Sequence, residues 1–263
     1  MSHLSDSALG AAGGAPALGA TMLDFTGVGM TYPGGAEAVR DVDLTVRRGE
    51  FVSVVGPSGC GKSTLLGIAS GLASPTSGSA VVEAQRRGFV FQDANLLPWR
   101  NVLKNVELFL ELDGTLGRSR RSNALDALET VGLTDYRDYL PHQLSGGMKM
   151  RVSLARSLTL EPDLFLFDEP FGALDELTRE RLNDEVLGLF ADRRFAGLFV
   201  THSVREAIYM STRVVVMSGS PGRIVDEVDI PFGLDRDATI RFSPEFAALN
   251  ERISAALRSG YSE

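Results

Sequence analysis

The segment GPSGCGKST, residues 56–64, restricts the fold of this chain more than any other feature of its sequence. It follows a short apolar run, Phe51 to Val55, of the kind found in strands buried on both faces, and it precedes a helical pattern, KSTLLGIASGL. The spacing GxxxxGK followed by Ser or Thr, between a strand and a helix, predicts a phosphate-binding loop. A glycine-rich turn without function is the alternative, and the two flanking elements disfavour it.

Each part of this loop has an expected task. Glycines allow the backbone to curl so that N–H groups face phosphate oxygens, and the following helix adds its positive end. Lys62 would reach the outer phosphates, and the Ser63 hydroxyl would ligate Mg²⁺. The residues expected to surround the phosphates are Gly56, Pro57, Ser58, Gly59, Cys60, Gly61, Lys62, Ser63 and Thr64.

Cys60 is the only cysteine of the chain, which excludes an internal disulfide and fits a reducing compartment. Its place near a helix N-terminus could lower the pKa of its thiol and make it oxidisable. The simpler interpretation, which the sequence favours, is a small residue that fits the loop.

Two carboxylates end a second apolar run, LFLFDEP, at residues 164–170. Neighbouring strand residues face opposite ways, so Asp168 is expected beside Mg²⁺ and Glu169 beside the terminal phosphate, as the general base that polarises water. Taken alone, such a segment is more often only a polar turn. Beside a phosphate loop in the same sheet, a catalytic pair is the favoured interpretation.

Two more polar residues follow predicted strands. His202 follows LFVT and is expected at the carboxyl-end edge of the sheet, where it could hydrogen-bond a terminal phosphate. Gln92 follows GFVF and could reach Mg²⁺ or water with its amide oxygen. A structural histidine and an ordinary loop glutamine are the plain alternatives. His3 and His142 receive no role.

Strand-like and helical runs alternate along the chain, which implies a mostly parallel sheet covered by helices. Between about residues 101 and 160 the pattern is helical, as in a lobe inserted between two strand-rich parts. Strand-like runs are expected near residues 22–32, 42–46, 51–55, 80–83, 88–91, 164–167, 197–200 and 213–217.

The composition, with 44% hydrophobic and 23% charged residues, is that of a soluble globular protein. A formal net charge of −8 disfavours nonspecific binding to nucleic acid. No apolar run reaches the length of a membrane span, so membrane association is expected only through a partner. Residues 1–20 lack a basic start and a sustained apolar core, and we interpret them as a disordered leader and not as a signal peptide.

A second glycine turn, QLSGGMKMR at residues 143–151, raises the question of why one chain needs two. By itself the turn predicts a helix N-terminus capped by Ser145, with Gly146 and Gly147 at the entry. The positive end of such a helix suits a phosphate.

The chain resembles the nucleotide-binding subunit of ATP-binding cassette (ABC) transporters over about residues 23–230. The motifs that carry this resemblance are, in order, GPSGCGKST, Gln92, LSGGM, LFLFDEP, GALD and TH. The resemblance implies an α/β fold: a P-loop NTPase core with a mostly parallel sheet, an antiparallel β subdomain and a helical subdomain inserted at about residues 93–160. It also implies a single ATP-binding domain, residues 21–263, after the leader.

The resemblance also implies roles for matching residues. Tyr32 is similar to the aromatic that stacks on adenine, with a turn tyrosine as the alternative. Gln92 is similar to a switch glutamine that joins Mg²⁺ and nucleotide to the membrane partner, and Asp175 to a residue that crosses a dimer interface. The expected cofactors are ATP and Mg²⁺. Catalysis is expected from Glu169, His202 and Lys62, metal binding from Ser63, Gln92 and Asp168, and contact with ATP on the other subunit from Ser145, Gly146 and Gly147.

The implied function is an ATPase that energises an importer at the cytoplasmic face of the cell membrane. Its expected partners are a second cassette, integral membrane permease subunits and, indirectly, a solute-binding protein, but no nucleic acid. The pieces FQDANLLPWRNV, FDEPFGALDELTR and SGSPGRI are most similar to the importer group that serves nitrate, sulfonates, taurine and thiamine precursors. A soluble cassette ATPase of iron-sulfur cluster assembly is the alternative, whereas Glu169, Lys62 and His202 disfavour a module that does not hydrolyse ATP.

The sequence departs from the common family pattern in three places. Met148 stands where the commonest form has Gln, and Ser203 stands after the histidine where Asp is frequent. Only about 45 residues follow Met217, so the long regulatory domain of maltose-type importers is not expected.

An apolar cluster after Gln92 predicts a docking surface. Leu96, Leu97 and Trp99 lie in a loop bracketed by Asn95 and Pro98, where exposed apolar side chains would suit a partner helix. Packing inside the helical lobe is an equally weighted alternative.

Overall fold

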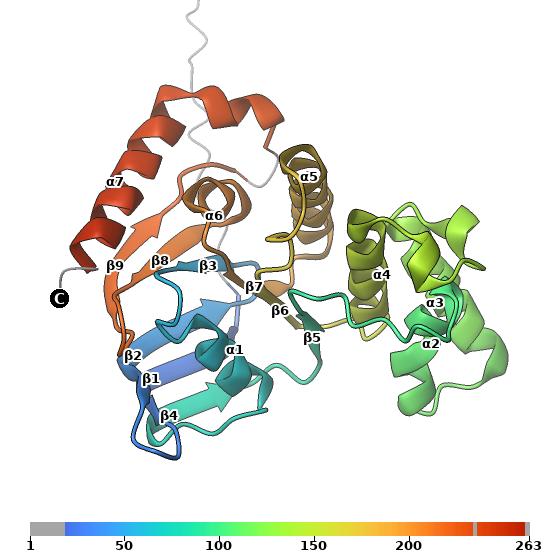
Figure 1. Cartoon of the computed structure of the whole chain (residues 1–263), viewed down its shortest axis with the longest axis horizontal. Coiled ribbons are helices and arrows are strands. Elements are labelled where there is room, and N and C mark those ends of the chain that lie inside the picture. Colours follow the sequence, from blue (N-terminus) through green and yellow to red (C-terminus); the bar gives the residue numbers. More distant parts are fainter. Residues whose placement is uncertain (1–18, 234–235, 261–263) are drawn as a thin grey trace, which may run out of the picture.

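The computed structural model describes residues 19–233 and 236–260. Figure 1 shows a larger α/β body and a smaller helical lobe beside it, joined through strands β5 (Arg87–Val90) and β6 (Leu164–Asp168) and helix α4 (Gly146–Leu158). The leader predicted at residues 1–20 lies, as far as residue 18, outside the described residues. Gly19 and Ala20 already pair with the backbone of Arg48, the residue after strand β2 (Glu37–Arg47).

The main sheet has six strands in the order β5-β6-β7-β3-β8-β9, all parallel to their neighbours except β9, which is antiparallel to β8. Five of these strands were predicted from apolar runs, and β9 was not. The bounds of the predicted strands are β3 (Phe51–Val55), β5 (Arg87–Val90), β6 (Leu164–Asp168), β7 (Ala196–Val200) and β8 (Arg213–Met217), and β9 is Ile224–Asp229.

A second sheet of three antiparallel strands lies below the main sheet in Figure 1, with the order β2-β1-β4. Its strands are β1 (Thr21–Thr31), β2 (Glu37–Arg47) and β4 (Ser77–Val82). A mostly parallel main sheet together with an antiparallel one confirms the predicted α/β fold class.

Helix α1 lies between the two sheets, whereas α5, α6 and α7 cover the opposite face of the main sheet (Figure 1). The lobe consists of α2, α3 and α4. The bounds are α1 (Lys62–Ser70), α2 (Val102–Leu112), α3 (Gly117–Thr130), α4 (Gly146–Leu158), α5 (Glu176–Arg193), α6 (Val204–Met210) and α7 (Pro244–Gly260). These three lobe helices lie inside the expected insertion, although its limits at about residues 93 and 160 stay a prediction.

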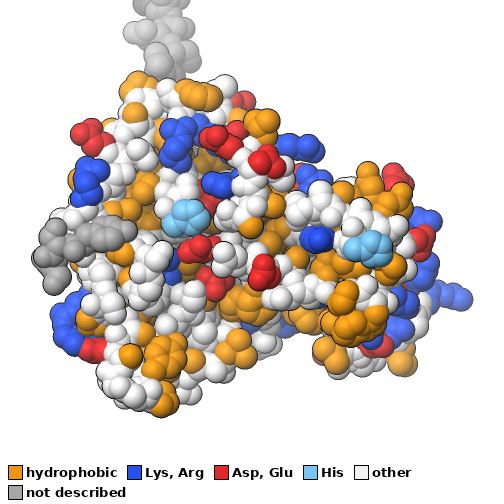
Figure 2. Space-filling view, viewed as in Figure 1, with side chains coloured by type: hydrophobic (Ala, Val, Ile, Leu, Met, Phe, Trp, Pro, Cys, Tyr) orange, Lys and Arg blue, Asp and Glu red, His pale blue; other side chains and the backbone are white. Residues whose placement is uncertain are grey.

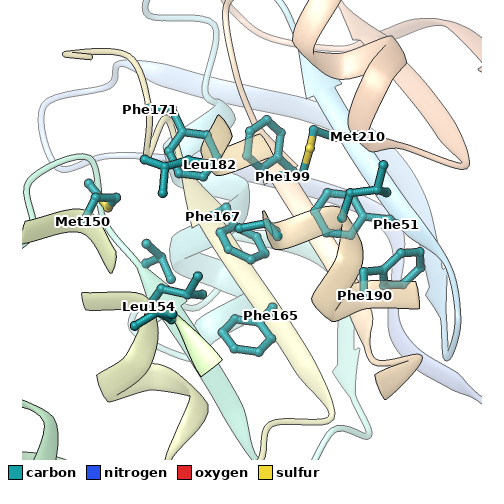
Figure 3. Close-up of a cluster of buried hydrophobic side chains, with 14 of the residues drawn as sticks. Phe51, Met150, Leu154, Phe165, Phe167, Phe171, Leu182, Phe190, Phe199 and Met210 are labelled. Atoms are coloured by element: carbon teal, nitrogen blue, oxygen red, sulfur yellow. The ribbon is translucent and has the colours of Figure 1, made fainter. Parts of the chain in front are cut away.

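Strand β6 shows why the central strands read as continuous apolar runs. Phe165 and Phe167 face the core that α5, α6 and α7 cover, and Leu164 and Leu166 face the core on the α1 side. All four are buried, because successive strand residues point to opposite faces and both faces are covered. Figure 3 shows the phenylalanine side of this core, where α4 also contributes side chains.

The parallel register brings three chain segments to one edge of the sheet. Asp168, the last residue of β6, lies beside Val200 of β7, and Val54 of β3 lies on the other side of Val200. The segments that leave these strands therefore start side by side. They are the glycine loop, the DEP turn and the Thr201-His202 pair.

Within the described residues, none of the helices combines the length and the apolar character that a membrane crossing needs.

Candidate nucleotide site

The glycine loop connects β3 to α1 in a conformation that its glycines permit. Gly61 precedes α1 with a φ of 95°, a left-handed value that side chains other than glycine's rarely adopt. A Cβ atom there would lie 2.3 Å from Val39 Cγ1 and 2.8 Å from the Ala38 carbonyl oxygen. Any larger residue would therefore displace the loop from strand β2, which fixes Gly61 on structural grounds.

Lys62 is buried at the first position of α1. Its ammonium donates hydrogen bonds of 2.8 Å to the carbonyl oxygens of Gly56 and Pro57, at the opposite end of the loop. The Lys62 ammonium is therefore held inside the glycine loop, where the sequence predicts that phosphates bind. The contact of Lys62 with the phosphates stays a prediction.

Cys60 is 1% exposed, and its thiol lies 4.0 Å from the Lys62 ammonium. Burial raises the pKa of the Cys60 thiol above its usual range, and the nearby Lys62 charge only partly opposes this. The idea that a helix N-terminus lowers the pKa and activates the thiol is therefore wrong, because desolvation outweighs the positive charges. The structure supports Cys60 as a small residue that fits.

Ser63 and Asp168 meet across the interface of α1 and β6. The Ser63 hydroxyl donates a 3.0 Å hydrogen bond to Asp168 Oδ1. Burial, followed by the charge of Glu169, raises the pKa of Asp168, whereas the Ser63 hydrogen bond and the Lys62 charge lower it. A hydroxyl and a carboxylate are hard oxygen donors, which fit Mg²⁺, an ion usually held by one or two protein ligands together with substrate phosphates. A divalent cation would also favour the ionised form of this carboxylate.

Glu169 contacts His202 on the exposed side of the same edge. Glu169 Oε2 lies 3.3 Å from His202 Nδ1, and the two side chains are 26% and 53% exposed. Glu169 has a φ of 44°, rare for a residue other than glycine, and its N–H donates to the Val200 carbonyl. The left-handed backbone at Glu169 changes the direction of the chain directly after β6. Asp168 therefore contacts Ser63, whereas Glu169 contacts His202. Strained backbone of this kind concentrates at functional sites.

Figure 2 shows a histidine and several acidic side chains together in the middle of the larger body, on an open face. The exposed fractions of the Glu169 and His202 side chains show that this pair is accessible to a ligand from solvent.

Tyr32 and Gln92 are both exposed, but the structure places them differently. The Tyr32 hydroxyl lies 3.1 Å from Thr64 Oγ1, so the ring stands beside the end of the phosphate loop. Gln92 lies two residues beyond Val90, which pairs with Phe167, so its backbone emerges next to the DEP turn. Within the described residues its side chain makes no hydrogen bond to Ser63 or Asp168, and its expected metal contact stays a prediction.

The second glycine turn forms the start of α4, as predicted. The Ser145 hydroxyl caps the helix by accepting a 3.3 Å hydrogen bond from the Met148 N–H. A Cβ atom on Gly147 would lie 2.7 Å from Thr178 Cγ2 in α5. The second glycine therefore permits close contact with the segment that follows GALD, apart from any role with phosphate.

This contact predicts coupling between Gly147 and Thr178. We expect Gly147→Ala to lower the free energy of unfolding by about 1 kcal/mol more in the natural background than in a Thr178→Ser background, because serine lacks the obstructing methyl group. Chemical denaturation of the two single variants and the double variant measures the difference. Equal costs in both backgrounds would show that the close approach is unimportant.

Asp175 is the N-cap of α5 and accepts a 3.0 Å hydrogen bond from the Thr178 N–H. Hydrogen bonds at this cap lower the pKa of its carboxyl. This is a structural role that the sequence analysis did not assign, and a contact of Asp175 with a second subunit stays a prediction.

The apolar cluster after Gln92 divides between the two interpretations. Leu96 is partly buried and packs against the core, as in the packing alternative, whereas Trp99 is 75% exposed, as the docking alternative requires. Trp99 lines a surface hollow of about 620 Å³ in the lobe, together with Arg100, Asn101, Lys104, Glu111, Asp138 and Leu140.

A group of polar side chains lies behind His202, between β7, α5 and α6. Thr201 entered the sequence prediction only as part of the TH motif, and Arg179 and Glu206 were not predicted to have a role. One signal was available for Glu206: Ser203 and Glu206 form the S-x-x-E spacing of a capping box.

A family description, ABC transporter, matches residues 39–172 of the chain. The match contains the phosphate loop, the LSGGM turn and the DEP segment.

Curated relatives match over most of their length. The taurine import ATP-binding protein TauB of Yersinia pestis is 38% identical over 244 residues, which are 88% of this chain and 95% of that protein. The nitrate import ATP-binding protein NrtD of Synechococcus elongatus is 41% identical over 242 residues, 86% of this chain and 88% of that protein.

Solved structures share the fold. The ATP-binding cassette MJ0796, solved as a dimer in a post-hydrolysis state bound to ADP and Pi, has a TM-score of 0.70 and 33% identity, covering 80% of this chain and 99% of that one. The cbiO1 protein from Clostridium perfringens has a TM-score of 0.74 over 92% of this chain and 98% of its own. Its identity is 24%, so it shows the fold alone.

Proposed function

The chain belongs to the ABC transporter family, as an ATP-binding subunit of the importer type, and we propose that Lys62, Ser63, Asp168, Glu169 and His202 form its hydrolytic centre. Members of this family are ATPases coupled to transport, and their cassettes work as dimers. The observation that carries the proposal is the pair of contacts at one sheet edge, Ser63 with Asp168 and Glu169 with His202.

These residues divide the tasks of phosphoryl transfer to water. Lys62 would bind the outer phosphates, and Ser63 with Asp168 would hold Mg²⁺, which would neutralise phosphate charge. Glu169 accepts a proton from the attacking water, and His202 orients that carboxylate through the contact of its Nδ1 with Glu169 Oε2. Tyr32 stacks on the adenine.

The transported molecule belongs, in this proposal, to the small solutes represented by nitrate, sulfonates, taurine and thiamine precursors. Support comes from the relatives whose names specify taurine and nitrate import, at 38% and 41% identity. Membrane permease subunits then hold the chain at the cytoplasmic face of the membrane, and a solute-binding protein delivers the solute to those subunits.

Trp99 and the hollow beside it supply the proposed contact with a permease subunit. An exposed tryptophan next to side chains of both charges suits a helix with an apolar anchor and polar flanks. We expect Trp99→Ala to weaken copurification with the membrane subunits at least about tenfold, with ATP affinity unchanged. Phe242→Ala is the matched control, because Phe242 is another exposed aromatic, 83% accessible, outside the lobe. An equal loss in both variants, or none in either, would contradict the docking role.

Fractionation of cells tests the function itself. The chain is expected to sediment with membranes and to copurify with a multi-span subunit, and a detergent extract should hydrolyse ATP faster when solute and binding protein are supplied. Recovery only in the soluble fraction, together with iron-sulfur assembly proteins, would favour the alternative ATPase.

A further inference from the structure

A buried polar cluster lies directly behind His202. Thr201 is 1% exposed and Glu206 is 7% exposed, and the Thr201 hydroxyl donates a short hydrogen bond to Glu206 Oε2. Burial raises the pKa of the Glu206 carboxyl, so this side chain is held out of water at an energetic cost. Acidic side chains are rarely buried unless they are paired with other groups, so the partners of Glu206 must explain its position.

The cluster encloses the backbone on both sides of His202. Thr201 Oγ1 accepts a 3.1 Å hydrogen bond from the Ser203 N–H, and Ser203 Oγ accepts a 3.3 Å hydrogen bond from the Glu206 N–H. In an ordinary capping box the glutamate side chain would accept from the N-cap N–H itself. Here the Thr201 hydroxyl stands between them, so a closed ring of hydrogen bonds runs from Glu206 through Thr201 and Ser203 and back to Glu206. His202, between Thr201 and Ser203, is flanked on both sides by residues of this ring, and its own side chain is free to reach Glu169.

The same cluster extends to α5, which packs against α6 (Figure 1). Both Arg179, by its positive charge, and Asn183 lower the pKa of Glu206, so both stand close to this carboxyl. Arg179 also donates a 2.9 Å hydrogen bond to the carbonyl oxygen of Leu174, the residue before Asp175. Among the described residues, Arg179 Nε, Asn183 Oδ1 and Glu206 Oε1 are buried without a hydrogen-bond partner. Buried polar atoms without a hydrogen-bond partner are unusual in a region whose only role is packing.

We propose that Thr201 and Glu206 are positioning residues, which set the His202 ring against Glu169 and connect it through Arg179 to the turn that ends at Asp175. This inference rests on the proposed hydrolytic centre. The ring of hydrogen bonds fixes the backbone at residues 201–203, and that backbone decides whether Nδ1 reaches Glu169 Oε2. Both residues are buried, so the proposed role is to position His202 and not to contact the nucleotide.

The test compares Thr201→Val with Thr201→Ser, each in the natural background and in a His202→Ala background. Valine keeps the shape of threonine and removes the hydroxyl, whereas serine keeps the hydroxyl. In the natural background we expect Thr201→Val to lower kcat about tenfold, with KM for ATP changed less than about twofold, and Thr201→Ser to stay within about twofold. In the His202→Ala background Thr201→Val should have no further effect on kcat, because the group that it positions is gone.

The outcomes separate this inference from the proposed function. If His202→Ala alone leaves kcat unchanged, the hydrolytic centre is wrong. If His202→Ala lowers kcat but Thr201→Val lowers it equally in both backgrounds, the centre stands and the positioning role is wrong. Circular dichroism and nucleotide affinity establish that each variant is folded. If Thr201→Val does not fold, Glu206→Leu and Glu206→Gln replace the pair under the same criteria, since glutamine keeps an oxygen that accepts from Thr201 and leucine does not.

Discussion

Glu169→Gln is expected to lower kcat for ATP hydrolysis by about 10³-fold while leaving ATP binding intact. Glutamine has nearly the shape of glutamate, and its amide oxygen can still accept a hydrogen bond from His202 at the 3.3 Å contact. It cannot take a proton from water. The variant therefore removes the general base and keeps the surrounding geometry. Because it should bind ATP without hydrolysing it, the ATP-bound dimer should accumulate.

Steady-state phosphate release and equilibrium binding of ATP measure the two halves of this prediction. Glu129→Gln is the matched control, because Glu129 is an exposed glutamate of α3, in the lobe and away from the sheet edge. Its kcat should equal that of the natural protein. Near-normal turnover in Glu169→Gln would remove Glu169 as the base and leave the DEP segment as a polar turn.

The sequence predicted those strands whose pattern of apolar residues matches the burial of their side chains in the folded protein. FVSVV and LFLF predicted central strands because both faces of β3 and β6 are covered, so every position is apolar or small. Strand β9 was missed. Its sequence, IVDEVD, carries three acids and only one fully buried residue, Val228, because it is the antiparallel edge strand of the sheet. An edge strand has one neighbour and needs little apolar surface, so it leaves a weak signal.

The site divides in the same way. The meeting of Ser63 with Asp168 was predictable, because adjacent parallel strands deliver their carboxyl ends to one edge. The burial of Cys60 was not, since it depends on how Met217 and strand β2 close over the loop. The contact of Glu206 with Thr201 was also not predictable, because the capping-box spacing indicates a different acceptor and the pairing of α6 with α5 is a tertiary event.

Mixing two inactive variants should restore activity if the two glycine turns serve different subunits. In one chain α1 lies between the two sheets and α4 lies in the lobe, on either side of β5 and β6 (Figure 1). Within the described residues, Ser145 makes no hydrogen bond to the phosphate loop. The first turn supplies the Lys62 cation, and the second supplies the Ser145 hydroxyl at a helix N-terminus. Neither turn supplies both groups.

Lys62→Ala removes the cation of the first turn, and Ser145→Asp places a negative charge at the second. Aspartate caps helices as well as serine does, so α4 should persist while phosphate is repelled. Ser145→Asn keeps the cap without the charge and is the matched control. Each inactive variant alone forms dimers in which both sites are defective.

In a dimer of one chain of each kind, one site lacks both Lys62 and Ser145 and the other has both natural residues. Random pairing of equal amounts makes half of the dimers mixed, so about a quarter of all sites should be intact and about a quarter of the ATPase activity should return. If Lys62 and Ser145 act on the same bound nucleotide within one chain, every site keeps a defect and mixing restores nothing. Recovery would therefore show that neither glycine turn is a spare copy of the other, because a complete site then requires two chains.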